Sequence, residues 1–258
     1  MTAVEAPRPR FGQIADVLRD RIARGVYPPG HPLPSEPDLS QEFDVSRITI
    51  NRAVGLLRSD GLVRVRRGRG TFVRAIPVIT REASHRFEDR ERGRGAFDVE
   101  VRALGLEPRQ QTTVERLPAS ERAADLLQVP LGTELVVRRR RFYADDEPVQ
   151  LADSYIPADL AERARVTEPD TGPGGSYSRL ADIGHAPVDF LEDVTCRGAT
   201  AKEAGFLGIE PSQPVLEVLL IAADASGNPV SLTQHVMPGH QWRLRYHWTN
   251  PTSEQTDA

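Results

Sequence analysis

The sequence contains few of the residues that mark secreted, membrane-spanning or metal-binding proteins. Its 258 residues include a single cysteine, Cys196, so no internal disulfide can form, and a reducing cytoplasm is the expected location. No apolar run is long enough for a membrane-spanning helix, and the first residues lack the layout of a signal peptide. The six histidines show no metal-ligand spacing, so we expect neither a metal nor a cofactor.

Charge is distributed unevenly along the chain. The net charge is −4, but residues 1–75 contain 13 arginines and no lysine against 8 acidic residues, which gives this part +5 and the remainder −9. The positive charge of the amino-terminal part, against the negative charge of the remainder, indicates that the amino-terminal part binds a polyanion. The length of the chain and its 39% hydrophobic residues are typical of a globular protein with two domains or one large one.

Helical periodicity and capping residues organise the amino-terminal part. A first helix is predicted over Arg10–Arg24, and a second over Glu36–Phe43 behind the capping serine Ser35. A third helix begins after Ser46 and ends at Gly61. Two short strands follow, near residues 62–66 and 71–74, and the "RGRG" turn joins them. Three helices and a hairpin in this order predict a winged helix-turn-helix domain over residues 1–75.

The third helix of such a domain enters the DNA major groove with its amino-terminal end first. Arg47 and Asn51 lie four residues apart on one face, and these side chains can bond the edges of guanine and adenine. Glycine in the hairpin turn allows the backbone to approach a sugar-phosphate chain. The alternative is an arginine-rich surface that only faces solvent. The residues predicted to contact DNA are Ser46, Arg47, Thr49, Asn51, Arg52, Arg67, Gly68 and Arg69.

The stretch "LPSEPDLSQEFDVSRITINRAVGLLRSDGLVRVRRGRGTFV", residues 33–73, resembles the DNA-binding domain of the GntR family of bacterial transcriptional regulators. The resemblance implies that Ser35 also faces DNA, together with Ser46, Arg47, Thr49 and the turn residues 67–69. Members of the family often have arginine in place of Asn51 and a charged residue in place of Pro37. Both differences remove potential guanine contacts, so the family's operator sequences do not carry over to this chain.

The rest of the chain alternates strands with short helices, which predicts an α+β protein with an antiparallel sheet in its second domain. We expect a linker over residues 76–95, an effector-binding and dimerisation domain over 96–248, and a disordered tail over 249–258. A last strand is expected in "QWRLRYHW". The other strands are expected near 108–117, 134–143, 148–156, 187–197, 214–223 and 229–237, and helices near 120–127, 157–164, 176–183 and 200–207.

An internal repeat lies within this second domain. Residues 119–157 parallel residues 199–238, with equivalent positions 80 apart and then, after one extra residue in the second turn, 81 apart. Each copy reads as a capped helix, a strand, a proline-containing turn and a second strand. Our hypothesis is that the two units pair around a pseudo-two-fold axis in one antiparallel sheet. Two copies are too few for a solenoid.

Three stretches of the second domain resemble the UTRA effector domain of the HutC subfamily of GntR regulators: "LVVRRRRFYADDEPVQLADSYIP", "GGSYSRLADIGH" and "CRGATAKEAGFLGIEPSQPVLEVLLIAADASGNPV". The resemblance implies a chorismate-lyase-like fold, a pocket for a small molecule and homodimerisation through this domain.

Several residues could bind that small molecule. "RRRR", residues 138–141, alternates on a strand, so one pair of arginines could grip a carboxylate or phosphate. Alternation alone leaves open which pair faces the pocket, and we take Arg139 and Arg141 as candidates. The helix start at Gly175 and Ser176 could receive an anion. The resemblance adds Tyr177 and Glu192.

Sugar-phosphate sensors of the subfamily carry a glutamate near Ala152 and an arginine near Leu220, and both positions are apolar here. This difference argues against an amino-sugar phosphate as the ligand.

These features predict a homodimeric repressor of transcription that reads an inverted repeat and responds to a small anionic or amphipathic metabolite. One alternative is residual lyase-like activity in the second domain. Against it, the sequence shows no nucleophile–base pair, and its only lysine is Lys202. Another alternative is a constitutive DNA-binding protein without an effector. We do not expect an enzyme.

Overall fold

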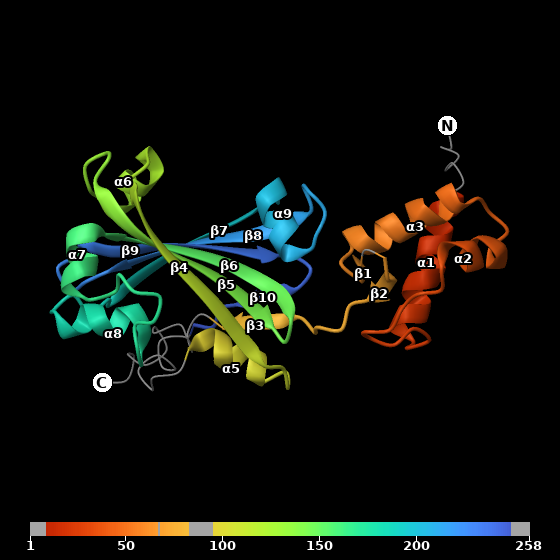
Figure 1. Ribbon diagram of the computed structural model, residues 1–258, viewed down its shortest axis with the longest axis horizontal. Coiled ribbons are helices and arrows are strands. Elements are labelled where there is room, and N and C mark those ends of the chain that lie inside the picture. The colour runs from red at the N-terminus through yellow and green to blue at the C-terminus, as the bar shows by residue number, and fades with distance from the viewer. Residues whose placement is uncertain (1–8, 67, 83–94, 249–258) are drawn as a thin grey trace, which may run out of the picture. The chain divides into compact units, whose positions relative to one another are not determined.

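The computed structural model describes residues 9–66, 68–82 and 95–248, and it contains two compact units (Figure 1). The first unit takes in the chain up to Pro77 together with Arg197–Pro214, and the second takes in Val78–Cys196 and the chain from Val215 onward. Strand β3 (Ile79–Glu82) lies within residues 76–95, where the sequence analysis expected a linker. Residues 83–94 of that linker and the predicted tail lie outside the described residues.

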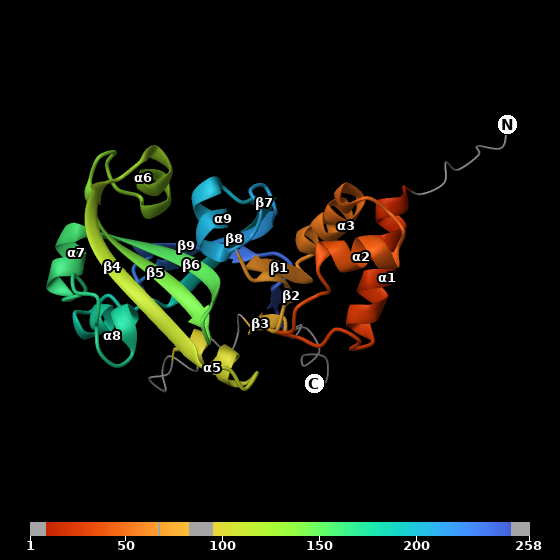
Figure 2. The same ribbon diagram turned by 45° about the vertical axis from the view of Figure 1, so that its right-hand side comes forward.

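The first unit has the predicted three helices and hairpin (Figure 2). Helices α1 (Arg10–Ala23), α2 (Glu36–Glu42) and α3 (Arg47–Ser59) precede the antiparallel strands β1 (Val63–Arg66) and β2 (Gly70–Val73). The apolar stripes of the helices meet in one core, to which the hairpin adds its two end residues. Its buried members include Ile14, Leu18, Leu39, Ile50, Leu57, Val63 and Val73.

Serine side chains fix where the second and third helices begin. Ser35 accepts from the backbone N–H of Asp38, and the Asp38 carboxylate accepts from the Ser35 backbone in return, which completes a capping box. Ser46 accepts from the backbone N–H of Thr49. Each cap satisfies backbone donors that the first turn of a helix leaves without a partner. The cap at Ser35 sets the start of α2, and the cap at Ser46 sets the start of α3.

The second unit is built on a six-stranded antiparallel sheet with the order β4-β5-β6-β9-β8-β7. The predicted strand positions are confirmed to within three residues. The sheet consists of β4 (Pro108–Pro118), β5 (Glu134–Ala144), β6 (Glu147–Pro157), β7 (Asp189–Gly198), β8 (Pro214–Ala223) and β9 (Pro229–Pro238).

The sheet bears out the hypothesis drawn from the repeat, because both hairpins belong to it and meet at its centre. The β5–β6 hairpin belongs to the first copy and the β8–β9 hairpin to the second, and β6 pairs with β9. Asp153 pairs with Gln234 across this central seam, and these two residues are equivalent in the repeat. A residue that faces its own equivalent marks the pseudo-two-fold axis.

Helices cover both faces of the sheet, with α6 on one side and α5 and α8 on the other (Figure 1). Leu135 and Val137 of β5 pack with α6 (Glu121–Leu127). Val136, which lies between these two residues in the strand, packs with α7 (Ala158–Arg163) and α8 (Gly175–Asp182) on the opposite face. Helix α9 (Ala201–Leu207) begins at a capping box formed by Thr200 and Glu203.

Two elements escaped the sequence analysis. Strand β3 pairs in parallel with the predicted last strand, β10 (Trp242–Arg245). Helix α5 (Ala96–Arg102) buries Phe97 and Val101 at helical spacing, and the Phe97 ring lies 4.7 Å from that of Phe142. Among the described residues, no helix is both long and apolar enough to cross a bilayer.

Candidate DNA-binding and effector sites

The outward face of α3 carries the side chains expected to read DNA. Arg47, Asn51 and Arg52 are exposed, whereas Ile50 and Leu57 are buried in the core. Ile48 projects from the first turn with 69% of its surface exposed. The helix therefore turns a polar face with one apolar member away from its own domain, as an element that inserts into a groove would.

Neighbouring polar groups already engage some of these residues. The Ser46 hydroxyl lies 3.0 Å from the Thr49 hydroxyl, and the Ser35 hydroxyl donates to Asp38 at 2.6 Å. The Asn51 amide donates to the Glu36 carboxylate at 3.0 Å. Ser35 and Ser46 thus serve as helix caps in the free protein, and Asn51 has a fixed partner on α2.

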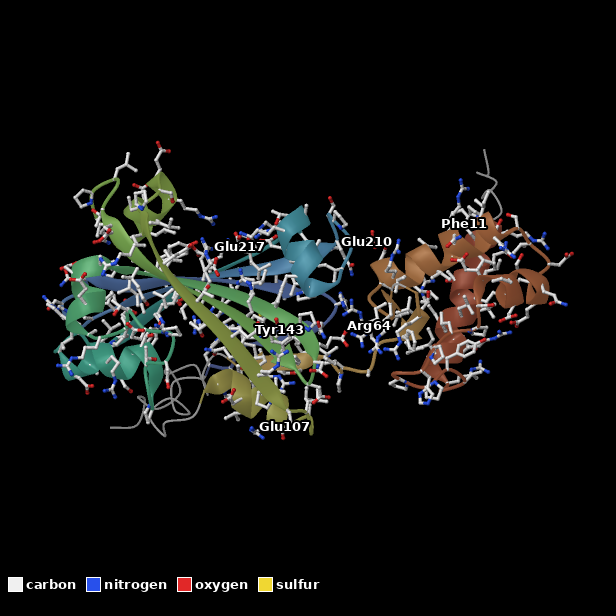
Figure 3. All side chains as sticks on the ribbon, in the orientation of Figure 1. Phe11, Arg64, Glu107, Tyr143, Glu210 and Glu217 are labelled. Atoms are coloured by element: carbon white, nitrogen blue, oxygen red, sulfur yellow. The ribbon has the colours of Figure 1, made fainter. Side chains whose placement is uncertain are left out.

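The hairpin has the geometry of a wing. Gly68 and Gly70 have φ of +74° and +104°, a region that glycine adopts without strain, and the Arg69 backbone N–H donates to Arg66 at 2.8 Å. The Arg66 guanidinium lies 4.9 Å from the centre of the Phe72 ring, and Arg69 is exposed. Arg64 lies on β1 (Figure 3). Arg67, also predicted to contact DNA, lies outside the described residues.

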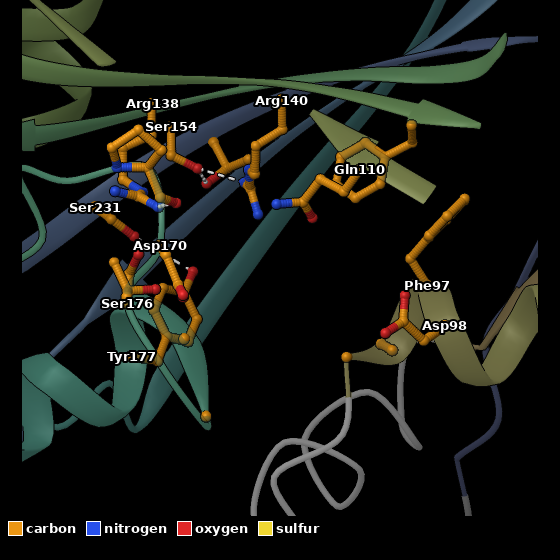
Figure 4. Close-up of a pocket in the computed structure, with 18 of the residues that line it drawn as sticks. Phe97, Asp98, Gln110, Arg138, Arg140, Ser154, Asp170, Ser176, Tyr177 and Ser231 are labelled. Carbon is orange, nitrogen blue, oxygen red and sulfur yellow. Dashed lines mark hydrogen bonds between the residues drawn. The ribbon is translucent and has the colours of Figure 1, made fainter. Parts of the chain in front are cut away.

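A cavity of about 340 Å³ opens in the second unit between the sheet, α5, α8 and the loop before α8 (Figure 4). Its volume falls in the range of ordinary small-molecule pockets, roughly 300–1,000 Å³. Of the predicted effector residues, Gly175, Ser176 and Tyr177 line it. Other polar lining residues are Asp98, Gln110, Arg138, Arg140, Gln150, Ser154, Asp170, Thr171, Ser231, Thr233 and His235.

The arginine pair at the cavity is not the predicted one. Arg138 and Arg140 line the cavity, while Arg139 and Arg141 lie on the other face of β5 and bond to Asp153. The reason is strand parity: Arg138 and Arg140 share the face of Val136, which packs with α7 and α8. Arg139 and Arg141, which we took as candidates, therefore do not line this cavity.

The two cavity arginines differ in their partners. Arg138 is buried and donates to three backbone carbonyls of the loop between α7 and α8. They belong to Val166 at 2.7 Å, Pro169 at 2.8 Å and Glu168. Burial lowers the pKa of Arg138. Arg140 donates to the Ser154 hydroxyl at 2.6 Å. Arg138 thus holds the cavity wall in place, and Arg140 presents a guanidinium within it.

Glu192 is the other predicted effector residue that the structure places elsewhere. It lies on β7 and is absent from the cavity lining. Its carboxylate forms a paired bond with the buried guanidinium of Arg81 on β3 and accepts from the Tyr246 hydroxyl at 2.9 Å. Glu192 therefore attaches β3 to the edge of the main sheet. Its side chain is engaged in that attachment.

The loop before α8 depends on glycine where it borders the cavity. Gly174 has φ of +78°, and a Cβ atom there would collide with the side chain of Ser178. Across the cavity, burial raises the pKa of Asp98, and the nearby Arg102 partly opposes this effect. Tyr177 accepts from the Ser231 hydroxyl at 3.3 Å. The site therefore combines the guanidinium groups of Arg138 and Arg140 with hydroxyl and carboxyl groups.

No cluster of histidine, cysteine, aspartate and glutamate that could hold a metal ion occurs among residues 9–66, 68–82 and 95–248.

Leu220, at the position where sugar-phosphate sensors have arginine, lines the cavity with an apolar side chain. The sequence analysis missed α5 and the loop residues Pro169, Asp170 and Thr171 as sources of lining residues. The Phe97–Val101 spacing could have indicated the helix.

Comparison with known proteins gives these sites a family context. Residues 11–73 match the family described as bacterial regulatory proteins, gntR family, and residues 103–243 match the UTRA domain family. The first match covers α1 to β2, with the polar face of α3 and the wing. The second covers the strands and helices that enclose most of the cavity.

Similar proteins extend over nearly the whole chain. An uncharacterised HTH-type transcriptional regulator of Streptomyces coelicolor is 30% identical over 263 residues, with 98% of each chain covered. The HTH-type transcriptional repressor NagR of Bacillus subtilis is 27% identical over 216 residues, which cover 82% of this chain and 83% of NagR. The crystal structure of PhnF from Mycobacterium smegmatis shares the fold, with a TM-score of 0.57 at 24% identity over 92% of this chain and 99% of PhnF.

Both the domain matches and the whole-length relatives agree with the geometry of the α3 face, the wing and the cavity. The predicted α+β fold, with a winged helix-turn-helix followed by a UTRA domain, is confirmed. The chain belongs to the GntR family of bacterial transcriptional regulators, and it is a DNA-binding regulator whose second domain is a UTRA effector domain.

Proposed function

We propose that this protein is a cytoplasmic, homodimeric repressor that reads an inverted-repeat operator and is controlled by a small anionic metabolite. The observation that carries the proposal is the exposed amino-terminal face of α3, with Arg47, Asn51 and Arg52 beside an arginine-bearing wing. A two-fold dimer reads an inverted repeat because its two recognition helices are related by the same symmetry. NagR, a relative over most of the chain, is named a repressor.

The anionic character of the effector is inferred from the cavity. Arg140 lies among hydroxyl groups of the sheet, and the loop Gly172–Gly174 brings backbone close to the start of α8. A guanidinium and a helix amino terminus both favour negative charge. The apolar Leu220 and the carboxyl group of Asp98 limit how much negative charge the site accepts, which favours a ligand with a single anionic group.

The DNA half of the proposal is tested by selection from a pool of duplexes with randomised half-sites, using the full chain. We expect enrichment of one inverted repeat. The absence of any enriched sequence would contradict the proposal. The oligomeric state of the bound protein, measured by light scattering, should be two chains per duplex.

The effector half is tested by a thermal-shift screen of the full chain against phosphosugars, carboxylates and neutral apolar compounds. A ligand at a hundred times its Kd adds roughly 2.7 kcal/mol to stability, which is measurable. Hits among the anions support the Arg140 site. Hits only among neutral compounds would contradict the proposal that the effector is anionic, but they would still support a ligand-binding role for the second domain.

A further inference from the structure

The first residue of α2 and the second turn of α3 are joined by a hydrogen bond that the DNA-binding role does not by itself explain. The Asn51 amide nitrogen donates to the Glu36 carboxylate at 3.0 Å, and both side chains are exposed. Ser35 caps α2 and thereby places Glu36 at the start of that helix. The pair is therefore held by two capped helices, on the side of the domain that carries Arg47.

This bond fixes the orientation of the Asn51 amide. A side-chain amide has two N–H donors and one carbonyl oxygen. With one N–H bonded to Glu36, the other N–H and the oxygen remain available. Rotation of the amide by half a turn would place its oxygen against the carboxylate, and two acceptors repel each other. The free edge of Asn51 thus offers one donor and one acceptor in a fixed order.

The free edge of the Asn51 amide is complementary to the major-groove edge of adenine. In the major groove, adenine presents an acceptor at N7 and a donor at N6, whereas guanine presents acceptors at both N7 and O6. An amide in fixed orientation can form both bonds to adenine, but its oxygen would face guanine O6. An amide free to rotate could turn its N–H groups toward guanine.

The negative charge of Glu36 opposes attraction to the DNA backbone. A carboxylate near a duplex is repelled by the phosphates, whatever the base sequence. Asp38, two residues further along α2, is engaged in the cap with Ser35. Repulsion of Glu36 by the phosphates carries no sequence information, so its contact with Asn51 is the feature through which Glu36 can sharpen specificity.

We infer that Glu36 is a positioning residue for base recognition: it holds the Asn51 amide in the orientation that reads adenine and rejects guanine at one position of each half-site. The inference rests on the proposed function, because it presumes that α3 enters the major groove of an operator.

The test compares the full chain with Asn51→Ala, Glu36→Ala and Glu36→Gln by selection from randomised half-sites, followed by measured Kd values for the enriched duplex and its adenine-to-guanine variant. The wild type should prefer adenine over guanine by roughly 5- to 150-fold, the range of one good bidentate contact. Asn51→Ala and Glu36→Ala should both reduce this ratio to near one. A further variant that combines Glu36→Ala with Asn51→Ala should show no further loss of this ratio, because both residues act through the same contact.

Glu36→Gln is the matched control. Its amide oxygen can still accept from Asn51, so the adenine preference should persist, while loss of the charge should tighten binding to all duplexes. A Glu36→Ala protein that keeps the full adenine preference while Asn51→Ala loses it would overturn the inference and leave the proposed function intact. A wild type that enriches no sequence would overturn both. Circular dichroism melting of each variant separates a loss of folding from a loss of base preference.

Discussion

At the scale of single residues, neighbouring arginines on one strand have different partners and different roles. Arg138 is held by three carbonyls, Arg140 donates to the Ser154 hydroxyl, and Arg139 and Arg141 bond to Asp153 on the opposite face. The sequence showed the alternation but not its phase, because the phase depends on which helix covers which face. The caps at Ser35 and Ser46 were predictable because capping is decided within one helical turn.

Replacing each cavity arginine by methionine should separate their roles. Arg138→Met removes the donor from the carbonyls of Val166, which is buried, and of Pro169, and should lower the free energy of unfolding by about 1–3 kcal/mol. Arg140→Met should change stability little but remove the thermal shift produced by anionic compounds. Urea unfolding and the ligand screen measure the two effects. Equal destabilisation by both variants would contradict the division of roles.

The α3 face and the wing should respond differently to substitution. Arg47→Ala should cost roughly 1–3 kcal/mol of binding and relax specificity at one base pair, if its guanidinium bonds a base edge. Arg69→Ala on the wing should weaken binding to all sequences alike and reduce the salt slope by about 1. Kd values measured over a series of salt concentrations distinguish the two. Unchanged affinity in both variants would refute the groove assignment.

At the scale of elements, most strands and helices could be predicted from the sequence because each carries its own pattern. The repeat even indicated which hairpins share a sheet, and the pairing of Asp153 with Gln234 confirms this. Strand β3 could not be found this way, since its four residues become a strand only by pairing with β10, far along the chain. The cavity lining from α5 was missed for a similar reason: a seven-residue helix gives a weak periodic signal.

The attachment of β3 to the main sheet should depend on its buried ion pair. Arg81 has 2% of its side chain exposed and Glu192 14%. Glu192→Gln leaves a buried guanidinium without its counter-charge and should destabilise the protein by about 3–5 kcal/mol. Glu82→Gln breaks the neighbouring but more exposed pair with Arg245, and should cost about 0–1 kcal/mol. Unfolding curves that show equal losses for the two variants would contradict this account.

Helix α9 should lose stability in acid through its cap. Hydrogen bonds from Arg197, opposed in part by burial, lower the pKa of Glu203 to about 2 from 4.5. Because the folded-state pKa is the lower one, the carboxylate stabilises the fold above pH 4.5, and this contribution is lost as the pH falls toward 2. The difference in Tm between wild type and Glu203→Gln should be full at pH 7 and shrink below pH 4.5. Glu121→Gln, in the first turn of α6, is the control; a constant Glu203 difference down to pH 3 would refute the assignment.

At the scale of the whole molecule, the chain combines a basic amino-terminal part with an acidic remainder. Residues 1–75 carry +5 and the rest −9, so attraction to DNA is concentrated in the part that holds α3 and the wing. The sequence was sufficient to predict this division of labour. It could not identify the ligand, because the cavity is built from side chains of β5, β6, β9, α5 and α8 that only folding brings together.

The central claim is that a metabolite in the second domain controls DNA binding by the first. The most direct test is the Kd of the full chain for its selected operator, measured with and without a saturating compound from the thermal-shift screen, at one salt concentration. A coupling free energy of about 1–3 kcal/mol predicts a change in Kd of roughly 5- to 150-fold. Reciprocally, operator DNA should change the affinity for the compound by the same factor. A compound that binds tightly but leaves the operator Kd unchanged would contradict the account.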